Sequence, residues 1–137
     1  MRAFSVITCL LALGCSSATA PDEVKVVGTI VGLSEGVPQI EVPSTAQRGQ
    51  AFTVRITTTG NTCTEKLETE VNVSDAVAVV TPYDLEHRGG QCHDIGRTFE
   101  HTASVTFEQA GSARVDIRGR ETPGGVIVTL QRTVVVQ

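Results

Sequence analysis

The sequence lacks tryptophan and has few aromatic side chains of any kind. Its 137 residues include one tyrosine, Tyr83, and four phenylalanines, of which Phe4 lies near the amino terminus. Stacking of nucleic-acid bases, like lectin-type sugar binding, relies on aromatic faces. Their scarcity argues against both kinds of site, and it predicts a core built from aliphatic side chains, chiefly valine.

Positive charge is also scarce. Eleven Lys and Arg residues stand against fifteen Asp and Glu residues, which gives a formal net charge of −4. Proteins that follow a phosphate backbone concentrate basic residues on one face. We therefore expect no nucleic-acid partner, and we interpret the mild acidity as a contribution to solubility.

No apolar run is long enough to span a bilayer, which takes ~20 residues. The longest run near the amino terminus, residues 3–13, follows Arg2 and leads into Gly14 and Cys15. A charged start, a short apolar middle and a small-residue exit are typical of an export signal. Processing before Cys15 and processing after Ala18-Thr19-Ala20 are both open.

The segment Leu11-Ala12-Leu13-Gly14-Cys15 resembles the end of a bacterial lipoprotein signal peptide. The resemblance implies that residues 1–14 are removed and that Cys15 carries the lipid, which anchors the protein to the cell membrane or the outer membrane. Two or more acyl chains anchor stably, because each buried CH₂ contributes ~0.8 kcal/mol. The segment departs from the usual pattern in having Ala12 where leucine is common. Without lipidation the product is secreted.

The remaining 123 residues suffice for one domain. We expect a flexible tether over 15–23 and an all-β domain over 24–137. Alternation is clearest where Phe52, Val54 and Ile56 share one strand face, as in a half-buried antiparallel strand. Strands are predicted at 24–33, 39–43, 51–57, 67–73, 76–81, 101–107, 113–118 and 126–136.

Seven or eight short strands indicate an antiparallel β-sandwich. We predict that 101–107 and 113–118 form a hairpin, and that a bulge or a bend lies near Arg132 and Thr133. The stretches 43–56 and 103–117 resemble the opening and the late hairpin of bacterial immunoglobulin-like domains. That resemblance implies an immunoglobulin-like fold, although the chain has neither the core tryptophan nor the tyrosine corner of antibody domains.

Two cysteines of the domain, Cys63 and Cys92, are predicted to form a disulfide, because an isolated pair in an exported protein is most simply oxidised. A metal site is the rival interpretation. Its candidate ligands are Cys63, His87, Cys92, His93, Asp94 and His101. The spacing lacks the C-x₂-C or H-x₃-H step of zinc sites, and the loop carboxylates Asp84 and Glu86 lack the calcium-loop pattern. We predict no metal and no cofactor.

Catalysis has little support in this sequence. No serine occurs in a Gly-x-Ser-x-Gly elbow, and a nucleophile needs an adjacent base and an oxyanion site. We therefore predict no enzyme, no catalytic residue and no small-molecule substrate.

The longest irregular segment is predicted at 82–97, and long loops on rigid scaffolds often bind partners. Its candidate binding residues are Tyr83, Leu85, His87, Arg88 and His93. The predicted function is therefore that of a membrane-anchored extracytoplasmic domain that binds another macromolecule, such as an envelope or surface protein, or serves as a spacer. The alternative is an assembly module of the cell envelope that pairs through the valine-rich first or last segment.

Overall fold

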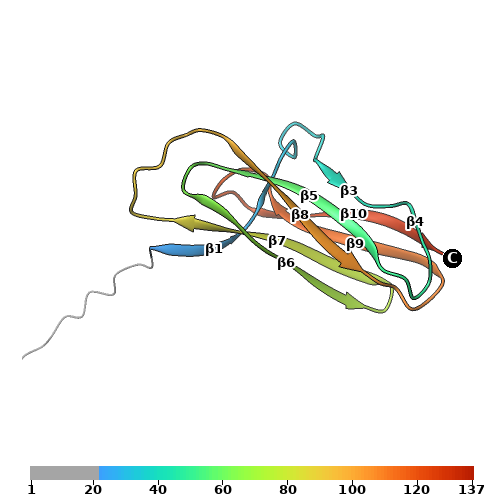
Figure 1. Cartoon of the computed structure of the whole chain (residues 1–137). Helices are drawn as coiled ribbons and strands as arrows, with labels where there is room; N and C mark the ends of the chain where they lie inside the picture. Colours follow the sequence, from blue (N-terminus) through green and yellow to red (C-terminus); the bar gives the residue numbers. More distant parts are fainter. Residues whose placement is uncertain (1–21) are drawn as a thin grey trace, which may run out of the picture.

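The computed structural model describes residues 22–137 (Figure 1). The predicted signal peptide, the predicted lipid-attachment residue Cys15 and most of the predicted tether lie outside the described residues. Between residues 22 and 137 the chain is all-β, as predicted, and has no helix. In particular, that part of the chain holds no helix long and apolar enough to cross a membrane.

Ten strands make up the domain, rather than the seven or eight predicted. The seven long strands are β1 (Glu23–Val27), β5 (Phe52–Gly60), β6 (Thr64–Ser74), β7 (Val77–His87), β8 (Arg97–Val105), β9 (Gly111–Arg120) and β10 (Ile127–Val136). Three strands have two residues each: β2 (Thr29–Ile30), β3 (Ile40–Glu41) and β4 (Thr45–Ala46). The structure has more strands than predicted for two reasons. The two-residue strand β4 is too short to show an alternating pattern, and the predicted first strand divides into β1 and β2.

Gly28 is the residue at which that first segment divides. Its amide donates to the carbonyl of Pro82 at 2.9 Å, so the chain leaves β7 here and continues as β2 beside β5. A Cβ at Gly28 would lie 2.5 Å from Cγ2 of Thr58 and 2.9 Å from Oδ2 of Asp84. Only glycine allows the backbone to pass this close to both side chains.

Two layers of strands face each other across the core (Figure 1). In one layer β5 lies between β8 on one side and β2 and β3 on the other. In the second layer β7 lies between β6 on one side and β1 and β9 on the other, and β10 continues beyond β9 to β4. Because β2 pairs with both β5 and β9, all ten strands belong to one continuous sheet.

The core is aliphatic, as the composition predicts. Inward-facing residues of β5 and β8, such as Val54 and Val105, pack in the same cluster as Val80, Val115 and Val134 of the opposite layer. Phe107 is the only buried aromatic residue among 22–137. Its ring centroid lies 5.9 Å from that of the half-buried Phe52.

The predicted hairpin of 101–107 with 113–118 is wrong. β8 pairs with β5 along its whole length, from Val105 opposite Phe52 to Arg97 opposite Gly60, whereas β9 pairs with β10, β7 and β2. Residues 106–110 therefore cross from one layer to the other. Alternation shows which face of a strand is buried, but it does not identify the neighbouring strand.

The predicted bulge near Arg132 and Thr133 is also absent. β9 and β10 keep one register from Ile127 to Val136, and Arg132 occupies the inward row between Leu130 and Val134 with its side chain half-buried. A long aliphatic stem lets arginine sit in such a row while its charged head reaches the rim. The irregularity lies in β6 instead, between Lys66 and Thr69.

The sheet is mixed, in contrast to the predicted antiparallel arrangement. β7 and β9 run parallel over four residues of each strand, β4 runs parallel to β10, and β2 pairs parallel to β9. Immunoglobulin sandwiches are built from two antiparallel sheets. The β7–β9 pair therefore departs from that topology.

The predicted long loop is shorter than expected. β7 continues through Pro82 to His87, so the irregular segment covers only 88–96. Proline has no amide hydrogen for a ladder and normally marks the end of a strand. Pro82 is tolerated within β7 because it lies opposite Thr69, directly beside the interruption in the β6 ladder.

Candidate functional site

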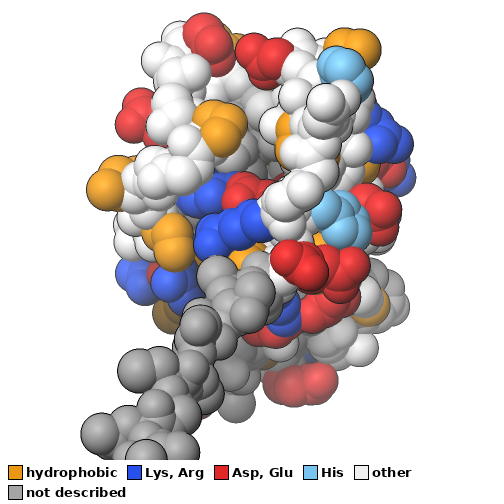
Figure 2. Space-filling model, turned by 90° about the vertical axis from the view of Figure 1, so that its left-hand side faces the viewer, with side chains coloured by type: hydrophobic (Ala, Val, Ile, Leu, Met, Phe, Trp, Pro, Cys, Tyr) orange, Lys and Arg blue, Asp and Glu red, His pale blue; other side chains and the backbone are white. Residues whose placement is uncertain are grey.

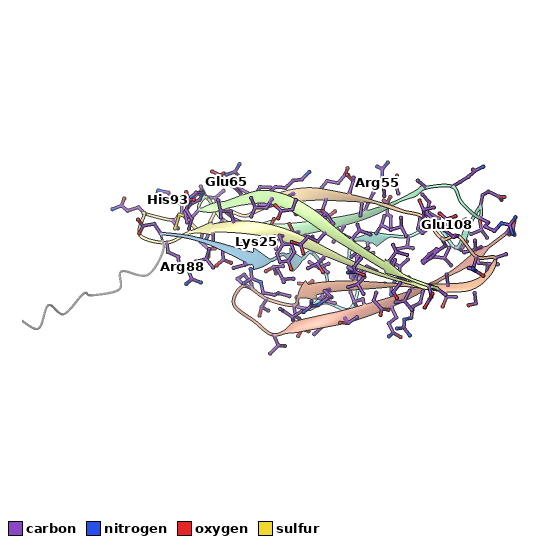
Figure 3. The ribbon with its side chains drawn as sticks, turned by 90° about the horizontal axis from the view of Figure 1, so that it is seen from below. Lys25, Arg55, Glu65, Arg88, His93 and Glu108 are labelled. Atoms are coloured by element: carbon purple, nitrogen blue, oxygen red, sulfur yellow. A yellow bond between two sulfur atoms is a disulfide. The ribbon has the colours of Figure 1, made fainter. Side chains whose placement is uncertain are left out.

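The five predicted binding residues do not share one loop. Tyr83, Leu85 and His87 lie on one face of β7, and only Arg88 and His93 belong to the segment 88–96. Figure 3 shows Arg88 and His93 at the same end of the molecule, with Lys25 nearer the middle. The structure thus divides the predicted surface between a sheet face and one end of the domain.

On the sheet face, Lys25 of β1 lies 4.0 Å from the ring centroid of Tyr83. Its Nζ also donates to Glu68 at 2.5 Å and to Glu70 at 2.7 Å on β6. These hydrogen bonds, first that to Glu68 and then that to Glu70, raise the pKa of Lys25 well above its usual range. The hydrogen bond from Lys25 lowers the pKa of the Glu68 carboxyl. Tyr83 is therefore covered by an ion-pair network.

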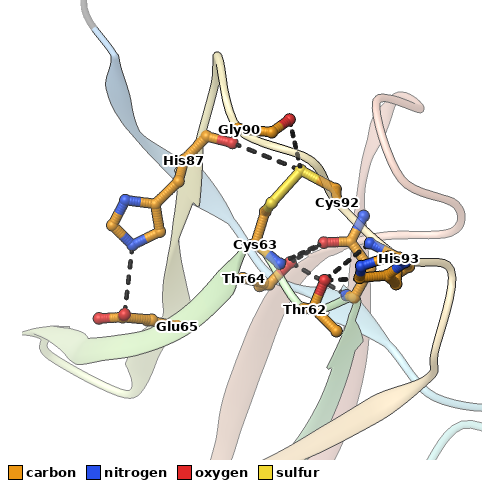
Figure 4. Close-up of a disulfide and its surroundings, with 9 residues drawn as sticks. Thr62, Cys63, Thr64, Glu65, His87, Gly90, Cys92 and His93 are labelled. Carbon is orange, nitrogen blue, oxygen red and sulfur yellow. Dashed lines mark hydrogen bonds and ion pairs between the residues drawn. A yellow bond between two sulfur atoms is a disulfide. The ribbon is translucent and has the colours of Figure 1, made fainter.

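The predicted disulfide between Cys63 and Cys92 is confirmed, with an S–S distance of 2.02 Å (Figure 4). It joins the turn before β6 to the segment after β7. Beside it, the amide of His93 donates to Oγ1 of Thr62 at 2.8 Å. The carbonyls of His87 and Gly90 approach the sulfur of Cys92 at 4.0 and 3.8 Å. These are contacts only, because a bonded sulfur carries no hydrogen to donate.

His87 is held between two carboxylates. Its Nδ1 lies 3.3 Å from Oε1 of Glu23, and its Nε2 lies 3.3 Å from Oε1 of Glu65. The amide of the next residue, Arg88, donates to the carbonyl of Asp22 at 2.6 Å. The start of the described chain is therefore fixed to the disulfide-linked end of the domain.

The rival metal cluster does not come together. Cys63 and Cys92 bond to each other, and His101 lies in the middle of β8, away from the segment 88–96. No group of three or more His, Cys, Asp or Glu residues within 22–137 is placed to hold a metal ion. The carboxylates of Asp84 and Glu86 belong to β7 rather than to a loop, and each contacts a basic side chain.

Asp84 and His101 form a buried polar pair that sequence reasoning missed. Nε2 of His101 lies 3.0 Å from Oδ1 of Asp84 and 3.1 Å from Oγ1 of Thr58, and its Nδ1 lies 3.2 Å from Oγ1 of Thr69. A carboxylate only accepts, so Nε2 donates to Asp84. The sequence placed His101 at a strand start. Its row, shared with Ala103 and Val105, signals burial, but no local signal identifies the partner on β7.

A hydrolase triad also joins a histidine to a carboxylate and a hydroxyl, but it places them on opposite ring nitrogens, whereas Asp84 and Thr58 both contact Nε2 of His101. Here the three members from β7, β8 and β5 are enclosed: Asp84 is 1% exposed, and His101 and Thr58 are 0% exposed. A substrate cannot reach any of them in this conformation. The pair therefore links the two layers through the core.

A cavity of about 420 Å³ opens at the disulfide-linked end. It lies between the carboxyl ends of β5, β7 and β9, the segment 88–96 and the turn from β9 to β10. Its lining includes both cysteines and the charged residues Glu86, Arg88, Asp94 and Arg120. Figure 2 looks onto this end and shows basic and acidic side chains gathered at the centre of the face.

Arg120 and Thr29 form the inner wall of this cavity, which we call the end cavity. Nη2 of Arg120 donates to Oε1 of Glu86 at 2.8 Å. Within residues 22–137, Nε of Arg120 and Oγ1 of Thr29 have no hydrogen-bond partner, although these residues are only 8% and 3% exposed. Buried polar groups without partners are unusual in folded proteins. Thr29, Glu86 and Arg120 were not predicted as binding residues from the sequence.

Comparisons with known proteins do not assign this chain to a family. No family model matches it, and neither a curated protein nor a solved structure matches it significantly.

Proposed function

We propose that this protein is an extracytoplasmic domain, anchored by a lipid on Cys15, whose disulfide-linked end binds a macromolecule at the membrane surface. The scaffold is a β-sandwich of the broad immunoglobulin-like kind, modified by the parallel β7–β9 pair. The domain acts by binding and not by catalysis. In the alternative role as a spacer, the same scaffold would bind no macromolecule at the disulfide-linked end.

The observation that carries the proposal is the disulfide between Cys63 and Cys92. Disulfides persist in oxidising compartments outside the cytoplasm and are rare inside it. The bond supports export, which is also what a charged, apolar and small-residue leader implies. The bond belongs to the folded domain, in a part of the chain that is separate from the leader.

The fixed position of Asp22 gives the anchored domain an orientation. The carbonyl of Asp22 accepts from Arg88 at the disulfide-linked end, and the C-terminus lies at the opposite end of the molecule (Figure 1). Six residues lie between Cys15 and Asp22, and the seven Cα–Cα steps of this stretch reach at most about 25 Å when fully extended. A lipid on Cys15 would hold the disulfide-linked end near the membrane and point the C-terminus away from it.

Replacement of the anchoring cysteine tests the first part of the proposal. Cys15→Ala should move the protein from the membrane fraction to the soluble fraction after cell lysis. The matched control is Cys9→Ala, which changes a cysteine of the leader and should leave the protein in the membrane fraction. Retention of the Cys15→Ala protein in the membrane fraction would contradict a lipid anchor.

Site-specific photocrosslinking in intact cells tests the second part. A crosslinker at Arg88 probes the disulfide-linked end, and one at Glu108 probes the opposite end (Figure 3). We expect one discrete adduct to an envelope macromolecule from position 88 and none from position 108. Equal adducts from both positions, or none from either, would favour the spacer role.

A second candidate function is assembly through a strand edge. β10 pairs with β4 only at Val135 and Val136, so from Ile127 to Thr133 its outer edge has no strand partner among residues 22–137. Val126, Ile127 and Val135 are 73%, 47% and 48% exposed. Unpaired edges readily accept another strand. The other predicted assembly segment, residues 24–33, contains most of β1 and all of β2. Within residues 22–137, β1 pairs with β7 alone, and β2 pairs with β5 and β9.

Sedimentation velocity distinguishes this candidate. Pairing through β10 predicts a dimer at micromolar concentration that Ile127→Lys converts to a monomer, because charge on an edge strand opposes strand addition. Lys66→Ala, on β6, is the control and should not change the sedimentation coefficient. A wild-type monomer at the highest soluble concentration would exclude assembly through β10.

A further inference from the structure

The end cavity has the size of a small-molecule site. Its volume of about 420 Å³ lies in the range of ~300–1,000 Å³ that is usual for ligand pockets. Its walls come from three strand ends and are held by the disulfide, by the Thr62–His93 hydrogen bonds and by the amide of Arg120, which donates to Gly28 at 2.9 Å. The cavity is therefore built into the folded domain.

Arg120 has more hydrogen-bond donors than partners. A guanidinium carries five N–H donors, and the described side-chain hydrogen bond of Arg120 uses only Nη2, toward Glu86. The side chain is 10% exposed, so bulk water reaches little of it. Nη1, Nε and the second hydrogen of Nη2 remain as donors, and guanidinium donors form strong charge-assisted hydrogen bonds to anionic oxygens.

The cavity wall carries both signs of charge. Arg88 and Arg120 supply two positive groups, and Glu86 and Asp94 supply two negative groups. A simple anion entering this cavity would meet Arg120 but would also be repelled by Glu86 beside it. A molecule that carries an ammonium close to its anionic group would satisfy the two charges of the Arg120–Glu86 pair together.

We propose that the end cavity binds a small zwitterion. Its anionic group, a carboxylate or a phosphate, would bind Arg120, with the hydroxyl of Thr29 as a further hydrogen-bonding group, and its ammonium would bind Glu86. Two sources share this chemistry: a free α-amino acid, and an ethanolamine phosphate such as a phospholipid head group. This binding site does not depend on the lipid at Cys15 and goes beyond the macromolecular contact proposed above.

Isothermal titration calorimetry of the purified full-length protein tests the proposal with five probes. Glycine and phosphoethanolamine are the two zwitterions, acetate and inorganic phosphate are the anions, and ethanolamine is the cation. We expect at least one zwitterion to bind at least tenfold more tightly than its matching anion and than ethanolamine. A preference for glycine indicates the amino-acid source, and a preference for phosphoethanolamine indicates the head-group source.

Variants assign the binding to the cavity. Arg120→Gln should weaken binding of the preferred zwitterion at least tenfold. The control is Arg114→Gln, because Arg114 is also an ion-paired arginine of β9, with Nε 2.7 Å from Asp116, but is 46% exposed and lies outside the cavity. Arg114→Gln should leave affinity unchanged.

Glu86→Gln keeps the test informative if Arg120→Gln fails to fold. Loss of the Glu86 carboxylate should weaken binding of the zwitterion and strengthen binding of the matching anion. The preference for the zwitterion over the anion should therefore disappear. Binding of the anions alone in the wild-type protein, no binding of any probe, or a zwitterion affinity untouched by Glu86→Gln would each overturn the proposal.

Discussion

At the scale of single residues, the buried polar side chains were the hardest features to predict. The alternation of β8 places His101 in a buried row, and a sequence reader can infer that much. Its partner Asp84 follows Pro82, which suggests a loop, and the two residues meet only because β7 and β8 face each other across the core. Burial follows from local pattern, whereas a contact between layers depends on the whole topology.

The Asp84–His101 pair should stabilise the fold as a unit. Removing one member of a buried hydrogen-bonded pair leaves the other without a partner, at a cost of up to about 3 kcal/mol. We expect that loss in the free energy of unfolding for Asp84→Leu, and a similar loss for His101→Leu. The double variant should lose clearly less free energy of unfolding than the sum of the losses of the two single variants. Urea denaturation followed by circular dichroism measures all three.

Glu100→Ala, which changes the exposed neighbour of His101, is the control for that cycle and should shift stability by no more than about 0.5 kcal/mol. Additive losses in the double variant would show that the two side chains act independently.

At the scale of strands, the long alternating elements were predictable and their pairing was not. The pattern of Phe52, Val54 and Ile56 located β5 correctly. The same kind of pattern in 101–107 and 113–118 located β8 and β9 but suggested a hairpin, because nothing local shows that residues 106–110 cross between layers. The two-residue strands β2, β3 and β4 are too short to carry a period.

Gly28 provides a test of the junction between β1 and β2. Gly28→Ala places a methyl group against Thr58 and Asp84, and such overpacking typically costs about 2 kcal/mol. We expect that loss in the free energy of unfolding. Gly90→Ala, where no atom lies within 4 Å of the added Cβ, should be nearly neutral. Equal effects of the two changes would contradict the close packing at the junction.

The ion pairs between β1 and β6 predict a dependence on pH. Lys25 lowers the folded-state pKa of Glu68 from its ordinary value of 4.5. The folded state therefore binds this proton less readily than the unfolded state. The contribution of the Lys25–Glu68 ion pair to the stability of the fold is complete above pH 4.5. It is lost as the pH falls through the folded-state pKa of Glu68.

Lys25→Met removes this contribution. Thermal unfolding should therefore show the wild type more stable than Lys25→Met near pH 7, with the difference shrinking below pH 4.5. The pair is exposed, so solvent screening keeps the difference small. A difference that grows on acidification would contradict the sign of the Glu68 shift.

At the scale of the whole molecule, the disulfide is the feature that connects sequence, fold and proposed location. It closes a loop with a sequence separation of 29 residues, for which the chain-entropy relation gives about 3–4 kcal/mol. The pairing was predictable because the domain contains only two cysteines. The cavity beside it was not, because its wall residues Thr29, Glu86 and Arg120 lie far apart in the sequence.

Loss of the disulfide should lower stability without changing the fold. Cys63→Ala with Cys92→Ala should reduce the free energy of unfolding by about 3 kcal/mol while the β-type circular dichroism spectrum is retained. Because the same end holds the cavity, calorimetry on this variant should also show weaker binding of the preferred zwitterion. Unchanged stability would mean that the other contacts at this end suffice to hold it.

The most direct test of an anchored, exported domain is the intact mass of the protein recovered from the membrane fraction, measured after alkylation without reduction. The account predicts a chain that begins at Cys15, carries added acyl mass and takes up no alkylating agent at Cys63 or Cys92. A chain that retains residues 1–14, or that is alkylated at both Cys63 and Cys92, would contradict this account.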